Sequence, residues 1–197
     1  IMQMDAGLDT GDMLLVKKTP IDPEETAEML FERLSALGAQ ALAEILPRLD
    51  DLHPVPQPAG DFGYAKMISK SMSPLDWNRS AAQLHDQVRG LVPWPSASMV
   101  LAGKPVKVHR TAVGGETSAP AGSVVEADKN GLAIACGDGR LLRVLELQGE
   151  GGKRMAANAF LNGKRIAVQT SSKPEELFLK HQVPGVEQVD SVYCFAD

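Results

Sequence analysis

The sequence changes character at about residue 96, and this change limits the folds that the chain can adopt. Beyond Ser96, short β-prone runs alternate with turns rich in Gly, Asn and Asp. Asn130-Gly131 is one of these turns, and Asn-Gly between apolar runs is a strong signal for a tight β-hairpin. About five short strands followed by a short helix predict a small closed barrel of the OB type. The expected strands are 98–101, 106–113, 123–127, 132–136 and 141–147, and the expected helix is 155–161.

The N-terminal quarter of the chain combines strands with a long helix. Residues 1–4 and 13–19 are predicted strands on either side of a loop rich in Asp and Gly. A helix is expected over 22–49, where apolar residues recur at three- and four-residue spacing. Asp22 is its predicted N-cap, a proline follows at the first helical position, and Glu25 completes a capping box.

Prolines and composition divide the chain into four parts. A Pro-rich stretch begins at His53, and a second helix is expected over 79–91. The chain opens with Ile in what resembles the middle of a strand, so we expect it to be part of a longer polypeptide. The predicted parts are an α/β region over 1–52, a linker and connecting helix over 53–95, a barrel over 96–166, and a tail of unknown role over 167–197.

The net charge of −5 is unevenly distributed. Residues 1–66 carry 5 Lys/Arg against 12 Asp/Glu, whereas residues 97–166 carry 10 against 6. This asymmetry indicates that the barrel handles a polyanion, although an ordinary solvated surface produces a net of +4 as readily. No apolar run approaches the roughly 18 residues of a transmembrane helix, so we expect no membrane partner. Two cysteines without a CxxC pair indicate a reducing compartment, and scattered histidines predict no metal site.

The stretch MDAGLDTGDM at positions 4–13 places three aspartates beside two glycines. An ordinary surface turn explains such a composition, and so does an active-site loop. Glycines allow the backbone to turn sharply and to approach a ligand closely. Composition alone favours the turn.

Several motifs in a fixed order resemble the methionyl-tRNA formyltransferase family, which belongs to the folate-dependent formyltransferases. They begin with LDTGDM at 8–13 and continue through PWP at 93–95, GKPVKV at 103–108 and FLNG at 160–163. The resemblance implies a fold of the α/β plus β class. It consists of the end of a Rossmann-like formyltransferase domain, followed by an OB-like barrel that binds tRNA.

The resemblance also implies an activity. Members of the family transfer a formyl group from 10-formyltetrahydrofolate to the amino group of initiator methionyl-tRNA. The reaction uses no metal, and we expect a cytoplasmic monomer. Asp9 aligns with the family's catalytic Asp. The family's catalytic Asn and His precede the signature, so these 197 residues are expected to be inactive on their own.

The predicted site has two parts. Asp9 is the catalytic residue, and Asp5, Gly7, Leu8, Thr10 and Gly11 form the folate-binding loop. The predicted tRNA contacts are the basic residues of the barrel region, namely Lys104, Lys107, Arg110, Arg140, Arg143, Lys153, Arg154, Lys164 and Arg165. Two alternatives stay open: a related formyltransferase that acts on a nucleotide-linked amino sugar, and a stand-alone RNA-binding module.

Overall fold

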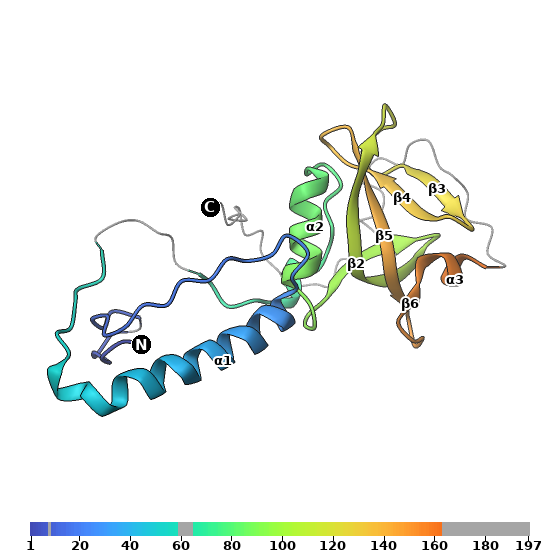
Figure 1. The fold of residues 1–197 in the computed structure, drawn as a ribbon. Helices are drawn as coiled ribbons and strands as arrows, with labels where there is room; N and C mark the ends of the chain where they lie inside the picture. The colour runs from blue at the N-terminus through green and yellow to red at the C-terminus, as the bar shows by residue number, and fades with distance from the viewer. Residues whose placement is uncertain (8, 59–64, 163–197) are drawn as a thin grey trace. The chain divides into compact units, whose positions relative to one another are not determined.

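The computed structural model describes residues 1–7, 9–58 and 65–162. The chain divides into two compact units, Ile1–Met67 and Ile68–Asp197 (Figure 1). The division falls inside the predicted linker, and the predicted C-terminal tail lies outside the described residues. Among the helices described, none is both long enough and apolar enough to cross a membrane.

The first unit contains one long helix, α1 (Ala27–Ile45), which begins later than the sequence predicts. Thr26 is the N-cap, and its side chain accepts a hydrogen bond from the backbone three residues on. Asp22, the predicted cap, instead begins a separate turn. The backbone N–H of Glu24 donates to Asp22 Oδ1 over 2.9 Å, and that of Glu25 donates to the Asp22 carbonyl over 3.0 Å. Two capping residues compete here, and the second one starts the helix.

The strands predicted at 1–4 and 13–19 are wrong as regular elements. The structure has two isolated antiparallel bridges there, Met2 with Met13 and Met13 with Val55. A strand requires several successive pairs, and a two-stranded ribbon without further neighbours is only marginally stable. Within the described part of this unit, no longer ladder forms.

The apolar face of α1 is only partly covered. Ala41 and Ile45 are its buried residues. Phe31 is 75% exposed, and Leu34 and Leu42 are 45% and 44% exposed. After the helix, the chain continues into the short 3-10 helix η1 (Leu46–Asp51), which has no buried residue. In its described residues, the first unit therefore lacks an extended apolar core.

The second unit is built on an antiparallel sheet with the order β1-β2-β5-β4-β3, and β6 pairs with β5 (Figure 1). The five longer strands lie where the sequence predicts them. The turn after Asp128 joins β3 to β4, so the Asn-Gly hairpin is confirmed. The strands are β1 (Ala97–Leu101), β2 (Lys104–Glu116), β3 (Val124–Asp128), β4 (Gly131–Ala135), β5 (Arg140–Gly149) and β6 (Met155–Ala156).

The sheet is open where the sequence predicts a closed barrel. β1 and β3 are the two ends of the strand order, and no ladder joins them within the described residues. β2 pairs with β5 through three register shifts, the first between Val108 and Arg110. Such irregularities bend a strand and increase its twist. They curve the sheet, but the described chain does not close it.

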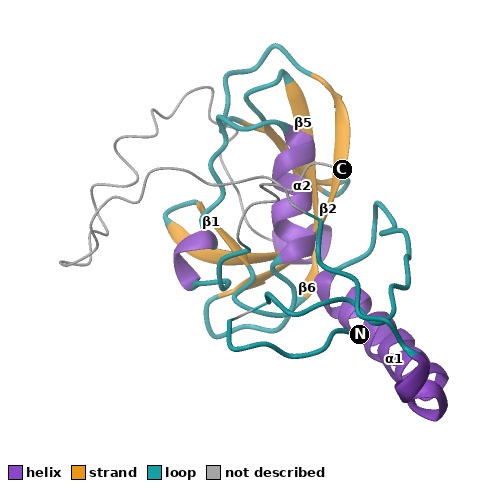
Figure 2. Cartoon of the chain, turned by 90° about the vertical axis from the view of Figure 1, so that its left-hand side faces the viewer, coloured by secondary structure: helices purple, strands orange, loops and turns teal. Residues whose placement is uncertain are grey.

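Two helices pack on this sheet. α2 (Ala81–Gly90) lies against β2 and β5 (Figure 2). Its start is a capping box, in which Ser80 accepts from the backbone of Gln83 while the Gln83 side chain accepts from the backbone of Ser80. The predicted helix at 79–91 is thus confirmed. The segment predicted as helix at 155–161 begins as β6 and continues as α3 (Ala157–Leu161).

The core of the second unit lies between α2 and the sheet. Leu84 of α2 and Val108, Leu142 and Leu147 of the strands have no exposed surface. Burying each such side chain contributes about 1.5–3 kcal/mol. The short 3-10 helix η2 (Lys70–Met72) precedes α2 and contributes no buried residue to this core.

The turn between β4 and β5 is tied to the start of α2. Both carboxylate oxygens of Asp138 accept a hydrogen bond from the Ala81 backbone over 3.2 Å. A Cβ on the neighbouring Gly137 would lie 1.9 Å from the Asn78 carbonyl oxygen, so only glycine fits there. The turn joins β4 and β5 as an antiparallel hairpin, and Asp138 adds a contact that the sequence did not indicate.

Candidate functional site

The Asp- and Gly-rich loop begins and ends on neighbouring backbone segments of the first unit. The backbone N–H of Gln3 donates to the Asp12 carbonyl over 2.9 Å and closes the base of the loop. A Cβ on Gly11 would lie 1.8 Å from the Gln3 carbonyl oxygen. The need for glycine at this position therefore follows from the close approach of the two loop arms. Leu8 lies outside the described residues.

The loop aspartates differ in their surroundings. Asp5 Oδ1 accepts a hydrogen bond from the Ala6 backbone over 2.6 Å, as expected of a turn-forming aspartate. Asp9 is exposed, and its φ of 56° lies in the left-handed region. Among the described residues, its carboxylate has no hydrogen-bond partner. The catalytic role of Asp9 stays a prediction.

One side chain holds the loop and another holds the segment that follows it, and the sequence indicated neither contact. The side-chain amide of Gln57 donates to the carbonyls of Asp9 and Gly11, over 2.9 and 2.8 Å. These partners are 48 and 46 residues away, so no local pattern reveals the contact.

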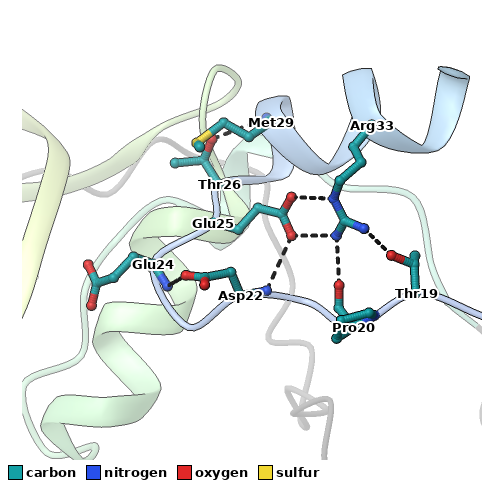
Figure 3. Close-up of polar contacts among 8 residues, drawn as sticks. All are labelled: Thr19, Pro20, Asp22, Glu24, Glu25, Thr26, Met29 and Arg33. Carbon is teal, nitrogen blue, oxygen red and sulfur yellow. Dashed lines mark hydrogen bonds and ion pairs between the residues drawn. The ribbon is translucent and has the colours of Figure 1, made fainter.

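The second contact is centred on Arg33 of α1 (Figure 3). Its guanidinium donates to both carboxylate oxygens of Glu25, over 2.8 and 2.7 Å, and this hydrogen bonding raises the pKa of Arg33. It also donates to the Pro20 carbonyl over 2.8 Å and to the Thr19 hydroxyl. Glu25 is only 8% exposed. Arg33 therefore fixes the segment that leads from the loop into α1.

The basic residues predicted to contact tRNA fall into different environments. Arg143 forms a bidentate pair with Glu126, over 2.8 and 2.9 Å. Arg154 lies 2.6 Å from Glu146, and Arg110 lies 3.6 Å from the same carboxylate. Ion pairs at a protein surface are weak, so these pairs add little to stability.

The other predicted cations are distributed over both ends of the sheet. Lys104, Lys107 and Lys153 are exposed. Lys107 is paired in register with Gln148, close to the Arg154–Glu146 pair. Arg140 begins β5 at its other end and donates to the Gly114 carbonyl over 3.2 Å. Lys164 and Arg165 lie outside the described residues.

His109 lies beside these cations but is not part of the exposed surface. It is 9% exposed, and its Nε2 lies 3.1 Å from Gln148 Oε1. Burial lowers the pKa of His109, and the positive charges of Arg154 and Lys107 lower it further. The neutral imidazole is therefore favoured in the folded protein.

Cys136 shows no sign of reactivity. It is a free, buried cysteine, and burial raises the pKa of its thiol to about 11. The thiolate is the nucleophilic form, so this side chain is inert at neutral pH. In the part of the chain that the structure describes, no group of three His, Cys, Asp or Glu side chains is arranged to hold a metal ion.

Two family models match the chain. The "Formyl transferase" model matches residues 1–46, and the "Formyl transferase, C-terminal domain" model matches residues 67–165. The chain belongs to the formyl transferase family. The loop with Asp9 lies inside the first match, and the sheet with its basic residues lies inside the second.

The formyl transferase relatives are longer than this chain. It is 42% identical to a methionyl-tRNA formyltransferase of Trichlorobacter lovleyi over 178 residues, which are 89% of this chain and 56% of the relative. Relatives at 44% and 41% identity carry the same name. The chain thus spans about half the length of the curated relatives it matches.

Solved structures share the fold at low sequence identity. HypX from Aquifex aeolicus, in complex with tetrahydrofolic acid, superimposes with a TM-score of 0.60 at 17% identity, over 82% of this chain and 29% of HypX. An N-formyltransferase from Helicobacter canadensis, in complex with folinic acid and dTDP-3-aminofucose, gives 0.56 at 16%, over 73% of this chain and 53% of that one.

Proposed function

We propose that these residues form the C-terminal part of a methionyl-tRNA formyltransferase of the cytoplasm. The full protein would transfer the formyl group of 10-formyltetrahydrofolate to the amino group of initiator methionyl-tRNA. The first unit would be the end of a Rossmann-like domain, and the second an OB-like tRNA-binding domain. The exposed carboxylate of Asp9, in a loop matched by the formyl transferase model, carries the proposal. Relatives named for this activity, 41–44% identical, support it.

Asp9 would act on the proton of the attacking amine. The amine nitrogen forms a bond to the formyl carbon, and the bond from that carbon to the folate nitrogen breaks. The attacking nitrogen must lose a proton, and the departing nitrogen must gain one. An exposed carboxylate at the turn accepts the first proton, directly or through a water molecule, and returns it. The developing oxyanion also requires hydrogen-bond donors, which an ionised carboxylate cannot supply.

The basic side of the second unit supports binding of a nucleic acid. Arg110 of β2 lies near Arg154, because both contact Glu146, and Lys107 is exposed on the same strand. Lys and Arg contacts to phosphates give affinity that falls with salt and does not depend on base sequence. This part of the surface is the proposed contact with the tRNA backbone.

Assays of the full-length protein test the acceptor. We expect formylation of methionyl-tRNA and none of a nucleotide-linked amino sugar. The alternative function, formylation of a nucleotide-linked amino sugar, is considered because the Helicobacter canadensis enzyme shares the fold. Formylation of the amino sugar alone would reject the proposal. Retention of tRNA without any formyl transfer would favour an RNA-binding module.

Replacement of Asp9 tests the mechanism. Asp9→Asn keeps the size of the side chain but removes the base, so kcat should fall about 10²–10⁴-fold. The matched control is Asp51→Asn, since Asp51 is exposed at the end of η1 in the same unit. Full turnover of the Asp9→Asn enzyme would contradict the assigned role.

A further inference from the structure

Gln57 occupies a defined position opposite the loop. Met13 and Val55 exchange two backbone hydrogen bonds, over 2.8 and 2.9 Å, and form an antiparallel bridge. In an antiparallel pair, moving two residues along one strand moves two residues back along the other. Residue 57 is therefore placed opposite residue 11. From that position the Gln57 side chain reaches the carbonyl oxygens of Asp9 and Gly11.

The amide contacts two carbonyls on either side of the loop's tightest bend. Gln57 Nε2 lies 2.9 Å from the Asp9 carbonyl oxygen and 2.8 Å from that of Gly11. Both are donor contacts, and a primary amide nitrogen has two hydrogens for them. One side chain thus fixes the orientation of two peptide groups, the one that follows Asp9 and the one that follows Gly11.

Asp9 needs such support because of its backbone conformation. Its φ of 56° is unfavourable for a residue with a Cβ atom. Conformations of this kind persist where the surrounding structure holds them, and they are concentrated at functional sites. The direction of the Asp9 side chain follows from that of its backbone, so a contact that fixes the Asp9 carbonyl also aims the carboxylate.

We propose that Gln57 is a positioning residue for Asp9, which it holds in the left-handed conformation that directs the carboxylate toward the reacting amine. This inference depends on the proposed catalytic role of Asp9. Gln57 itself acts through the loop backbone and touches neither reactant. This role requires a hydrogen-bond donor at position 57, so a side chain of equal length without N–H groups should not hold Asp9 in place.

Two isosteric substitutions in the full-length enzyme separate donation from packing. Gln57→Met keeps the length without any donor, and Gln57→Glu keeps the shape but presents only acceptors at neutral pH. We expect each to lower kcat about 10–100-fold, with KM for both substrates within about twofold, since a small misplacement of a catalytic group is costly. The matched control is Gln40→Met, since Gln40 is exposed on α1. It should keep the wild-type kcat.

A double-mutant cycle tests whether Gln57 acts through Asp9. In the Asp9→Asn background, Gln57→Met should have no further effect on kcat, because the group that it positions is gone. If Gln57→Met lowered kcat by the same factor in the wild-type and Asp9→Asn backgrounds, its role would be a general structural one, and the inference would be overturned. If Gln57→Met does not fold, as judged by circular dichroism, the same cycle with Gln57→Glu decides.

The cycle also distinguishes this inference from the proposed function. Should Asp9→Asn alone leave kcat unchanged, the catalytic role of Asp9 fails, and the inference fails with it. Should Asp9→Asn lower kcat while both Gln57 variants keep wild-type values, only the positioning role is overturned.

Discussion

In the second unit, a helix and several strands bury side chains such as Leu84 and Leu142 completely, whereas in α1 of the first unit only Ala41 and Ile45 are buried. The first unit depends instead on polar contacts, chiefly those of Arg33 and the residues it binds. The second unit thus has an apolar core of its own. The described part of the unit with the candidate catalytic loop has little apolar burial.

This difference bears on how a functional loop is built. Apolar packing fixes the position of an element but does not orient a single peptide group. Hydrogen bonds are directional, so Gln57 can hold the carbonyls of Asp9 and Gly11 in a conformation that packing alone would not select. The comparison of the two units can be tested by matched substitutions in each.

The two units should differ most in the loss of unfolding free energy when a leucine in each is replaced by alanine. Leu142 has no exposed surface, and Leu42 is 44% exposed. Leu142→Ala should lower the free energy of unfolding by about 2–5 kcal/mol, because it leaves a cavity. Leu42→Ala should cost less than about 1 kcal/mol, as for surface substitutions. Urea unfolding of the 197-residue chain measures both, and equal losses would contradict the difference between the units.

Replacing one glycine in each unit by alanine should change the unfolding free energy less than the leucine substitution in the second unit does. Only the substitution in the first unit should change the activity. An added Cβ would meet the Asn78 carbonyl oxygen at Gly137 and the Gln3 carbonyl oxygen at Gly11, at 1.9 and 1.8 Å. Gly137→Ala should cost about 1–3 kcal/mol of unfolding free energy through overpacking.

Gly11→Ala should instead reduce formyl transfer by the full-length protein about 10²-fold, because it displaces the loop. The thermal transition of the second unit should stay unchanged in this variant. A Gly11→Ala enzyme with normal turnover would show that the loop tolerates displacement, contrary to the positioning role of Gln57.

The smallest effect concerns pH. Because the pKa of His109 in the folded protein is below its ordinary value of 6.5, unfolding takes up a proton as the pH falls through that value. The stabilisation present above pH 6.5 is lost progressively below it. His109→Gln should reduce the decrease in Tm between about pH 8 and about pH 5.5 by a few degrees. His53 of the first unit is exposed, and His53→Gln should change nothing.

The sequence predicted the second unit well because its signals are local. The five longer strands and α2 follow from turn residues and from apolar periodicity. Closure of the sheet depends on how the end strands β1 and β3 meet, and no local pattern specifies that. The first turn of α1 was placed too early because Asp22 and Thr26 are both good capping residues, and only the folded chain selects between them.

The candidate site was predictable in part. Asp9 was identified through the family resemblance, since composition alone favoured an ordinary turn. Gln57 and Arg33 were not identified. The partners of Gln57 are more than forty residues distant, and Glu25, the carboxylate partner of Arg33, was assigned to a capping box. The tRNA-binding assignments stay predictions, and three of those arginines are in ion pairs with Glu126 or Glu146.

The bridge between Met13 and Val55 has a consequence for how such a chain tolerates changes in length. Extra residues inserted into the exposed turn at the end of η1 leave the bridge, and hence the register, intact. Removal of one residue between Val55 and Gln57 would bring Pro58 opposite Gly11. Proline has no side-chain donor, so a single deletion there would remove the hydrogen bonds that hold the loop.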